Sequence, residues 1–228
     1  MKLRQPPFEF GHRPGLEGTD FLTAPCNADA VAWLAAGRRW PGPALVLHGP
    51  IGCGKSHLAR LWCRREGGTE VPAQALSVEA VPGLIGAGAV LVVDGAEATA
   101  GEPERERALF HLYNLIGERQ GRLLLVARKP VDCWGVVLPD LLSRLRSMPS
   151  AGIGAPDDAV LAALLVKLLA DRQLSPPAEV VAFLVPRMER SFEAVRRMAE
   201  ALDRAALSEH RPITLPLARE VLAFFNQP

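Results

Sequence analysis

The stretch LVLHGPIGCGKSHLARLW, residues 45–62, contains three structural signals in a set order. The apolar run at 44–47 is typical of a buried strand, and residues 49–56 match the pattern G-x-x-x-x-G-K-[ST]. Apolar residues then recur at helical spacing (Leu58, Leu61 and Trp62). A strand, a glycine-rich loop and a helix in this order predict a loop that binds nucleotide phosphates. The alternative is a glycine-rich turn or an empty, decayed site.

The residues of this loop supply the chemistry that phosphates require. Its glycines allow the backbone to fold tightly, so that N–H groups and the helix N-terminus can surround the phosphates. Lys55 provides a positive charge for the outer phosphates, and Ser56 provides a hydroxyl for Mg²⁺. Cys53 is interpreted as a small filler residue, with a redox-sensitive thiol as the alternative. The candidate nucleotide-binding residues here are Gly49, Pro50, Ile51, Gly52, Cys53, Gly54, Lys55, Ser56 and His57.

Composition is that of an ordinary soluble globular protein. The 228 residues are 49% hydrophobic and 22% charged, and the net charge is +1. A net charge this close to zero gives no overall electrostatic attraction for nucleic acid, so we expect no strong direct DNA binding. The four cysteines (Cys26, Cys53, Cys63 and Cys133) show no C-x-x-C pairing and are expected to be free thiols. Residues 1–15 lack a signal-peptide core, and no apolar run approaches the ~18 residues that span a bilayer, so we expect a cytoplasmic protein without membrane contact.

Three segments of different character follow one another along the chain. Residues 1–20 are rich in Pro, Gly and charge and are expected to form an extended arm. In residues 21–155, strand candidates at 71–76, 89–94 and 122–127 alternate with helical patterns, which predicts an α/β domain with a parallel sheet. The run PSAGIGAPDD at 149–158 is interpreted as loop punctuation. Residues 156–228 then form an all-helical domain, with helices expected at 157–173, 177–187, 191–208 and 216–226.

Asp94 is the best candidate for the second half of the nucleotide site. It ends the buried strand VLVVD, where a carboxylate could hold Mg²⁺ together with Ser56. The alternative is a strand-end aspartate that caps a turn. Gly95 follows, where many ATPases of this architecture have an acidic residue that positions water. Glu97 could compensate only if a turn redirects it.

An ordered set of segments carries a family resemblance: GPIGCGKSHLA, VLVVDGAE, ALFHLYNLIGERQGRLLLVARKP, LPDLLSRL and LDRAALSEHRPITLPLAREVL. The set resembles the ATPase core of the DnaA-related branch of the AAA+ superfamily and, within it, the Hda-like regulatory inactivators of DnaA. The resemblance covers most of the chain from about residue 21 onward. It implies an AAA+ P-loop parallel-sheet domain followed by a small all-α lid domain, with ADP or ATP and Mg²⁺ as cofactors.

The resemblance also assigns residues outside the loop. Phe21, Leu22 and Asn27 match the segment that packs beside adenine, although they could equally be core residues at a helix entry. Arg144 matches the family's arginine finger, which acts on a neighbour's phosphates; the alternative is an ordinary surface arginine.

Residues 126–128 lack the polar sensor that usually reads the outer phosphate. The lid sensor position falls at Glu193, with arginines close by (Arg190, Arg196 and Arg197). Gly95 is a third departure, because many such ATPases have an acidic residue at that position. Together these departures predict that the protein holds nucleotide rather than hydrolysing it quickly.

The N-terminal arm contains a candidate partner-binding peptide. Gln5, Phe8 and Phe10 resemble the Q-x-x-[LF]-x-[LF] peptide that enters the pocket of the DNA polymerase sliding clamp, although Pro6 stands where an aliphatic residue is usual. The expected protein therefore works with the clamp to promote hydrolysis of DnaA-bound ATP. A DnaA-like helicase loader or other adaptor, and a self-sufficient ATPase, remain as alternatives, and the oligomeric state, including a homodimer, is left open. The chain stops after the last lid helix, so we expect no DNA-binding domain of the DnaA type.

Overall fold

The computed structural model describes residues 22–85, 89–209 and 211–225. Its first domain is built on a five-stranded sheet with the order β2-β3-β4-β1-β5, in which every pairing is parallel. The parallel sheet predicted from the alternation of strands and helices is confirmed. The strands are β1 (Ala44–His48), β2 (Thr69–Pro72), β3 (Val90–Asp94), β4 (Arg122–Ala127) and β5 (Ser150–Gly152).

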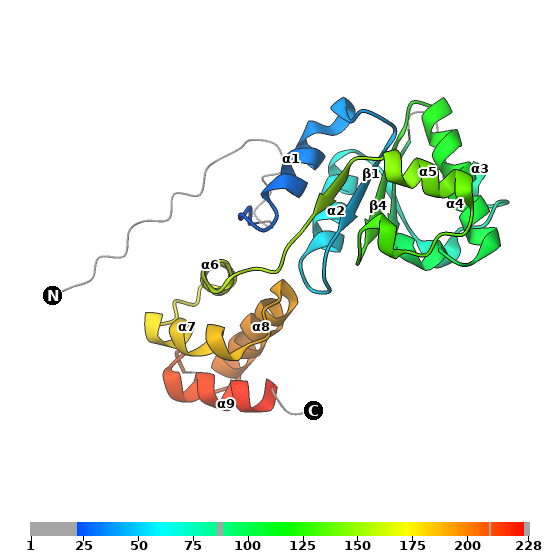
Figure 1. Cartoon of the computed structure of the whole chain (residues 1–228). Coiled ribbons are helices and arrows are strands. Elements are labelled where there is room, and N and C mark those ends of the chain that lie inside the picture. Colours follow the sequence, from blue (N-terminus) through cyan, green and yellow to red (C-terminus); the bar gives the residue numbers. More distant parts are fainter. Residues whose placement is uncertain (1–21, 86–88, 210, 226–228) are drawn as a thin grey trace.

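Helices cover both faces of this sheet (Figure 1). Leu45, Leu47 and Val126 face α1 and α2, whereas Val46 and Leu125 on the same strands face α4 and α5. Alternate side chains of a strand point to opposite faces, and both faces are buried at the central strands β1, β3 and β4, so these three strands are nearly continuous apolar runs. The helices of this domain are α1 (Ala28–Ala36), α2 (Lys55–Arg65), α3 (Val81–Leu84), α4 (Pro103–Glu118) and α5 (Pro139–Ser147).

The segment at 149–158 differs from its interpretation as a loop. Its residues 150–152 form β5, which pairs with β1 through Val46↔Ser150 and His48↔Gly152. Serine and glycine have low strand propensity, and three residues give no readable alternation, so pairing with β1 is what makes this segment a strand. The candidate at 71–76 is shifted as well, because β2 ends at Pro72 and the chain continues as a 3₁₀ turn, Ala73–Ala75.

Residues after β5 form a separate helical body, drawn from yellow-green to red in Figure 1. It consists of α6 (Asp158–Ala170), α7 (Ala178–Leu184), α8 (Phe192–Glu209) and α9 (Leu215–Phe225) around its own apolar core. Two side chains cap helices: Asp157 accepts a hydrogen bond from the N–H of Val160 (2.8 Å), and Ser191 accepts one from the N–H of Ala194 (3.0 Å). Within the described residues, no helix combines the length and apolarity needed to cross a membrane.

Candidate nucleotide-binding site

Three glycines make the phosphate loop possible between β1 and α2. Gly52 and Gly54 have φ angles of 75° and 91°, which L side chains rarely adopt. Gly49 has a different reason: a Cβ atom there would lie 2.4 Å from the carbonyl oxygen of Ile153. The loop therefore follows a path that only these glycines permit, and it leads directly into the N-terminus of α2.

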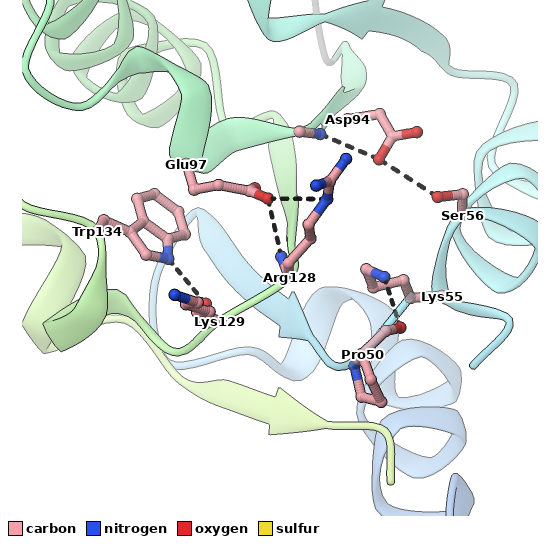
Figure 2. Close-up of polar contacts among 9 residues, drawn as sticks. Pro50, Lys55, Ser56, Asp94, Glu97, Arg128, Lys129 and Trp134 are labelled. Atoms are coloured by element: carbon pink, nitrogen blue, oxygen red, sulfur yellow. Dashed lines mark hydrogen bonds and ion pairs between the residues drawn. The ribbon is translucent and has the colours of Figure 1, made fainter. Parts of the chain in front are cut away.

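Lys55, Ser56 and Asp94 converge at one end of the sheet (Figure 2). The Nζ atom of Lys55 donates to the carbonyl oxygen of Pro50 at 2.9 Å. The hydroxyl of Ser56 donates to Oδ1 of Asp94 at 3.4 Å, and the N–H of Gly95 donates to the same oxygen at 3.0 Å. All of these residues except Pro50 line a groove of about 370 Å³. The two halves of the expected site, 38 residues apart in sequence, thus lie side by side.

The donor set at this point fits a magnesium ion. A serine hydroxyl and a carboxylate are hard oxygen ligands, and Mg²⁺ prefers one or two such protein ligands together with phosphate oxygens and water. Ser56 and Asp94 are already within hydrogen-bond distance of each other. They would hold the ion, whose chemistry when bound is to neutralise charge on the phosphates.

Glu97 and Arg128 also line this groove, although the sequence placed neither among the site residues. Gly95 has a φ angle of 71° and begins a 3₁₀ turn, Ala96–Thr99, which redirects Glu97 into the groove. Its Oε1 atom accepts a hydrogen bond from the N–H of Arg128 (3.1 Å) and lies 3.8 Å from the Nε atom of the same residue. In the sequence, the glycine before the turn is the feature that could have indicated Glu97. For Arg128, that feature is its position directly after β4.

The lid closes the other side of the loop. The N–H of Phe192, at the start of α8, donates to the carbonyl oxygen of Gly52 at 2.9 Å. A second groove of about 290 Å³ lies here, and its lining includes Glu193 and Arg196. Of the lid arginines that the sequence left open, Arg196 is thus the one in the groove. The other two have different contacts: Arg190 pairs with Asp158 at 3.1 Å, and Arg197 stacks over Phe225.

The segment expected to contact adenine lies between the sheet domain and the lid. Asn27 is 1% exposed, and its amide bonds to the backbone of Ala24 and Leu22, both at 2.9 Å, which fixes the turn before α1. Leu22 packs against the lid core. Neither residue lines the two grooves, and Phe21 lies outside the described residues. The adenine contact therefore stays a prediction.

Cys53 has the surroundings of a packing residue. It is 1% exposed and belongs to the core between the sheet and α1 and α2. Burial raises the pKa of its thiol, so the reactive thiolate is disfavoured. The interpretation as a filler residue is confirmed. All four cysteines are free.

Arg144 lies on α5, apart from the grooves. It is exposed, its guanidinium carbon lies 5.9 Å from the ring centre of Tyr113, and it lines neither of the two grooves beside the phosphate loop. The structure thus does not bring Arg144 to this chain's own phosphate loop. Gln5, Phe8 and Phe10 lie outside the described residues.

A glycine-rich loop on this parallel sheet, followed by a helical lid, gives the chain an AAA+ fold, which it shares with solved structures. Domain III of the Thermotoga maritima replication initiation protein DnaA superposes with a TM-score of 0.77 at 17% identity, covering 95% of this chain and 99% of that one. AMPPCP-bound DnaA from Aquifex aeolicus gives 0.66 at 17%, covering 82% and 65%. The Thermotoga maritima RuvB branch migration motor gives 0.66 at 14%, covering 81% and 62%.

The lid domain has a more specific similarity. Residues 157–222 match the family model of the Hda lid domain. This part of the chain is thus similar to the Hda lid domain, and the chain as a whole shares its fold with DnaA domain III.

Proposed function

We propose that this protein is a nucleotide-binding regulator of replication initiation that promotes hydrolysis of DnaA-bound ATP. The observation that carries the proposal is the separation of Arg144 from a groove that gathers Lys55, Ser56 and Asp94. The chain has a set of residues suited to gripping phosphates, and it also has an exposed arginine that does not line that groove. The match of residues 157–222 to the Hda lid domain supports DnaA as the partner.

The nucleotide is ADP or ATP with Mg²⁺. Lys55 and the loop N–H groups grip the phosphates, and Ser56 and Asp94 hold the ion. Leu22 and Asn27 would lie beside adenine. DnaA structures of the same fold contain AMPPCP, an ATP analogue. The loop already contacts the lid, because the N–H of Phe192 donates to the carbonyl oxygen of Gly52. Nucleotide bound in the loop would stabilise this contact.

Arg144 would act on the phosphates of DnaA. A guanidinium is always charged and planar, so it can make paired hydrogen bonds to a transferring phosphoryl group. Supplied by a neighbouring molecule, such a group is worth about 10³ to 10⁵ in rate. Tyr113 beneath it restricts its directions without neutralising its charge. The arm residues Gln5, Phe8 and Phe10 would bind the sliding clamp and so confine the reaction to replicated DNA.

The test compares two arginines of one helix. DnaA-bound ATP is followed over time with DNA-loaded clamp and wild-type, Arg144→Ala, Arg144→Lys or Arg146→Ala protein. Arg146 is the matched control because it is also exposed on α5 but pairs with Asp132 at 2.8 Å. We expect Arg144→Ala to lose most of the stimulation, Arg144→Lys to recover little of it, and Arg146→Ala to keep it.

Equal decay with the wild type and Arg144→Ala would remove the role of this residue. If the wild type binds nucleotide and clamp but leaves DnaA-bound ATP unchanged, the protein is instead an adaptor for another replication partner.

A further inference from the structure

An open apolar groove of about 770 Å³ lies on the lid between α6 and α7, which are side by side in Figure 1. Among the described residues, its lining comes only from these two helices and the turns that follow them. Most of the lining is small and apolar, as at Ala162, Val166 and Ala182, and Val166 is 45% exposed. Other side chains of the two helices, such as Leu165 and Leu184, pack into the lid core. The lid therefore presents an apolar surface that its own packing does not use.

This groove suits bulky apolar side chains from an extended peptide. Alanine, valine and proline leave room that a large side chain can fill, and a phenylalanine buries about 150–250 Å² when it is enclosed. The arm of this chain, residues 1–20, has Phe8 and Phe10 separated by one residue. In an extended peptide, alternate side chains point to the same side, so both rings could enter one groove.

The described part of the chain begins beside this groove. Leu22 packs against the lid core, and the N–H of Gly154 donates to the carbonyl oxygen of Cys26 at 2.8 Å. Gly154 precedes Asp158, the first residue of the groove, by four positions, which span at most ~14 Å. Phe10 precedes Leu22 by twelve positions, which can span up to ~40 Å. The phenylalanines of the arm can therefore reach the groove of their own molecule.

Charges at the two ends of the groove favour one direction for the peptide. Asp158, whose side chain is 45% exposed, marks the end at which the chain enters the lid, and Lys167 marks the other end. In the arm, Arg13 lies on the Leu22 side of the two phenylalanines, whereas Glu9 lies between them. A peptide that enters the groove from Leu22 would thus bring its basic residue to the acidic end and its acidic residue toward the basic end.

We propose that the arm docks in this groove of its own molecule through Phe8 and Phe10 and thereby covers the clamp-binding peptide. The inference rests on the proposed binding of the sliding clamp by the same peptide. A phenylalanine cannot occupy the lid groove and a pocket on the clamp at the same time, so the two sites compete. The docked arm withholds the protein from the clamp, and clamp binding uncovers the groove.

A weak contact is sufficient for this competition because both partners belong to one chain. Such a connection gives an effective concentration of about 1 mM, so a contact with a dissociation constant of about 0.5 mM would be formed about two thirds of the time. The apparent affinity for the clamp is reduced in proportion to the fraction of arms that are free. We therefore expect an effect of about threefold.

Protection of the arm from chymotrypsin tests the docking without the clamp. This protease cuts after phenylalanine, so cleavage after Phe8 and Phe10 in the full-length protein, followed by mass spectrometry, reports the free arm. We expect the double variant Val166→Glu and Ala182→Glu to be cut about three times faster than the wild type, because carboxylates in the groove oppose apolar docking. Ala170→Glu is the matched control, because it changes an exposed alanine of α6 that does not line the groove.

Two further measurements make this comparison specific. Val166 and Ala182 are exposed, so the lid core should tolerate the changes, and thermal unfolding checks that it does. Val166→Ser, a milder variant, should give part of the effect. Cleavage is also followed at several protein concentrations, because docking within one molecule does not depend on concentration.

Titration with the DNA polymerase sliding clamp tests the competition. The double groove variant should bind the clamp about three times more tightly than the wild type, because its arm does not have to leave the groove first. Ala170→Glu should bind the clamp as the wild type does.

The outcomes are distinct. Equal cleavage of the wild type and the groove variants would overturn the docking and leave the proposed clamp contact intact. Protection that grows with protein concentration would also overturn it, because a second copy would then supply the arm. Faster cleavage of the double variant without tighter clamp binding would contradict the competition. A wild type that is protected, in a series where no variant binds the clamp, would support the docking and contradict the proposed clamp contact.

Discussion

At the scale of single residues, the proposed binding of phosphates would depend on one ammonium group. Lys55 is 8% exposed, and its Nζ atom is held by the carbonyl oxygen of Pro50, at the edge of the groove that holds Ser56 and Asp94. Lysine is a compact point charge, so it can exchange a carbonyl for a phosphate oxygen with little movement. Such an exchange would allow a nearly buried residue to bind a phosphate.

We predict that Lys55→Ala abolishes binding of ADP with Mg²⁺ without unfolding the protein. The change removes the charge nearest to the outer phosphates and leaves the loop glycines in place. Calorimetric titration measures the affinity, and circular dichroism checks the fold. Lys129→Ala, which changes an exposed lysine outside the groove, should bind as the wild type does. Equal affinity of Lys55→Ala and the wild type would show that nucleotide binds elsewhere.

At the scale of elements, a buried carboxylate on α4 fixes the start of α5. Glu106 is 1% exposed and accepts hydrogen bonds from the N–H groups of Gly101 (2.8 Å), Val137 (3.0 Å) and Leu138 (2.6 Å). The last two precede Pro139, where α5 begins. Burial raises the pKa of Glu106, but the three backbone hydrogen bonds outweigh it and hold the pKa below its ordinary value. The placement of α5, and of Arg144 on it, depends on this group.

We predict that Glu106→Gln lowers the free energy of unfolding at pH 7 by about 2 kcal/mol, since an amide NH₂ would face N–H donors that need an acceptor. A depressed native pKa stabilises the fold above the unfolded value of about 4.3, and this contribution is lost as the pH falls through the native pKa. The difference between variant and wild type should therefore shrink in acid. Urea denaturation at a series of pH values measures it. A gap that stays constant with pH would contradict the role of the ionised carboxylate.

At the scale of the whole molecule, the lid and the sheet domain meet at the phosphate loop. The hydrogen bond from Phe192 to Gly52 and the close approach of Ser191 to Gly52 place the start of α8 directly on the loop. In Figure 1 the lid helices lie beside the sheet domain, and the chain passes from β5 into α6 without a further strand. Each domain has its own core, so contacts at the loop can change while the cores stay intact.

The proposed division of labour between arm and core leads to the next prediction. Replacing Gln5, Phe8 and Phe10 together by alanine should abolish binding to the sliding clamp and leave nucleotide affinity and thermal stability unchanged, because the peptide would use a preformed pocket on the clamp. Pull-down of the clamp measures the first effect, and calorimetry measures the second. The double change Arg4→Ala and His12→Ala, in the same arm but outside the peptide, is the control. Clamp binding that survives the triple change would contradict the assignment.

Much of the fold was predictable because its signals are local. The run at 44–62 contains the strand, loop and helix of the phosphate grip in consecutive residues, and the apolar runs ending at Asp94 and Ala127 are long enough to be read as buried strands. The lid helices follow from helical periodicity together with caps such as Asp157. These features depend on neighbouring residues, so no knowledge of the remainder of the chain was needed.

The sequence by itself therefore determined the class of fold, the phosphate loop and the candidate metal ligands Ser56 and Asp94. Only the tertiary structure decided that Ser150–Gly152 is a strand, because its pairing with β1 joins residues about a hundred positions apart. It also decided that Glu97 and Arg128 share the groove, since their contact spans 31 positions and depends on the turn after Gly95 and on the end of β4. The physical reason is the same in both cases: these contacts arise when distant segments pack, and no local pattern of residue types encodes them.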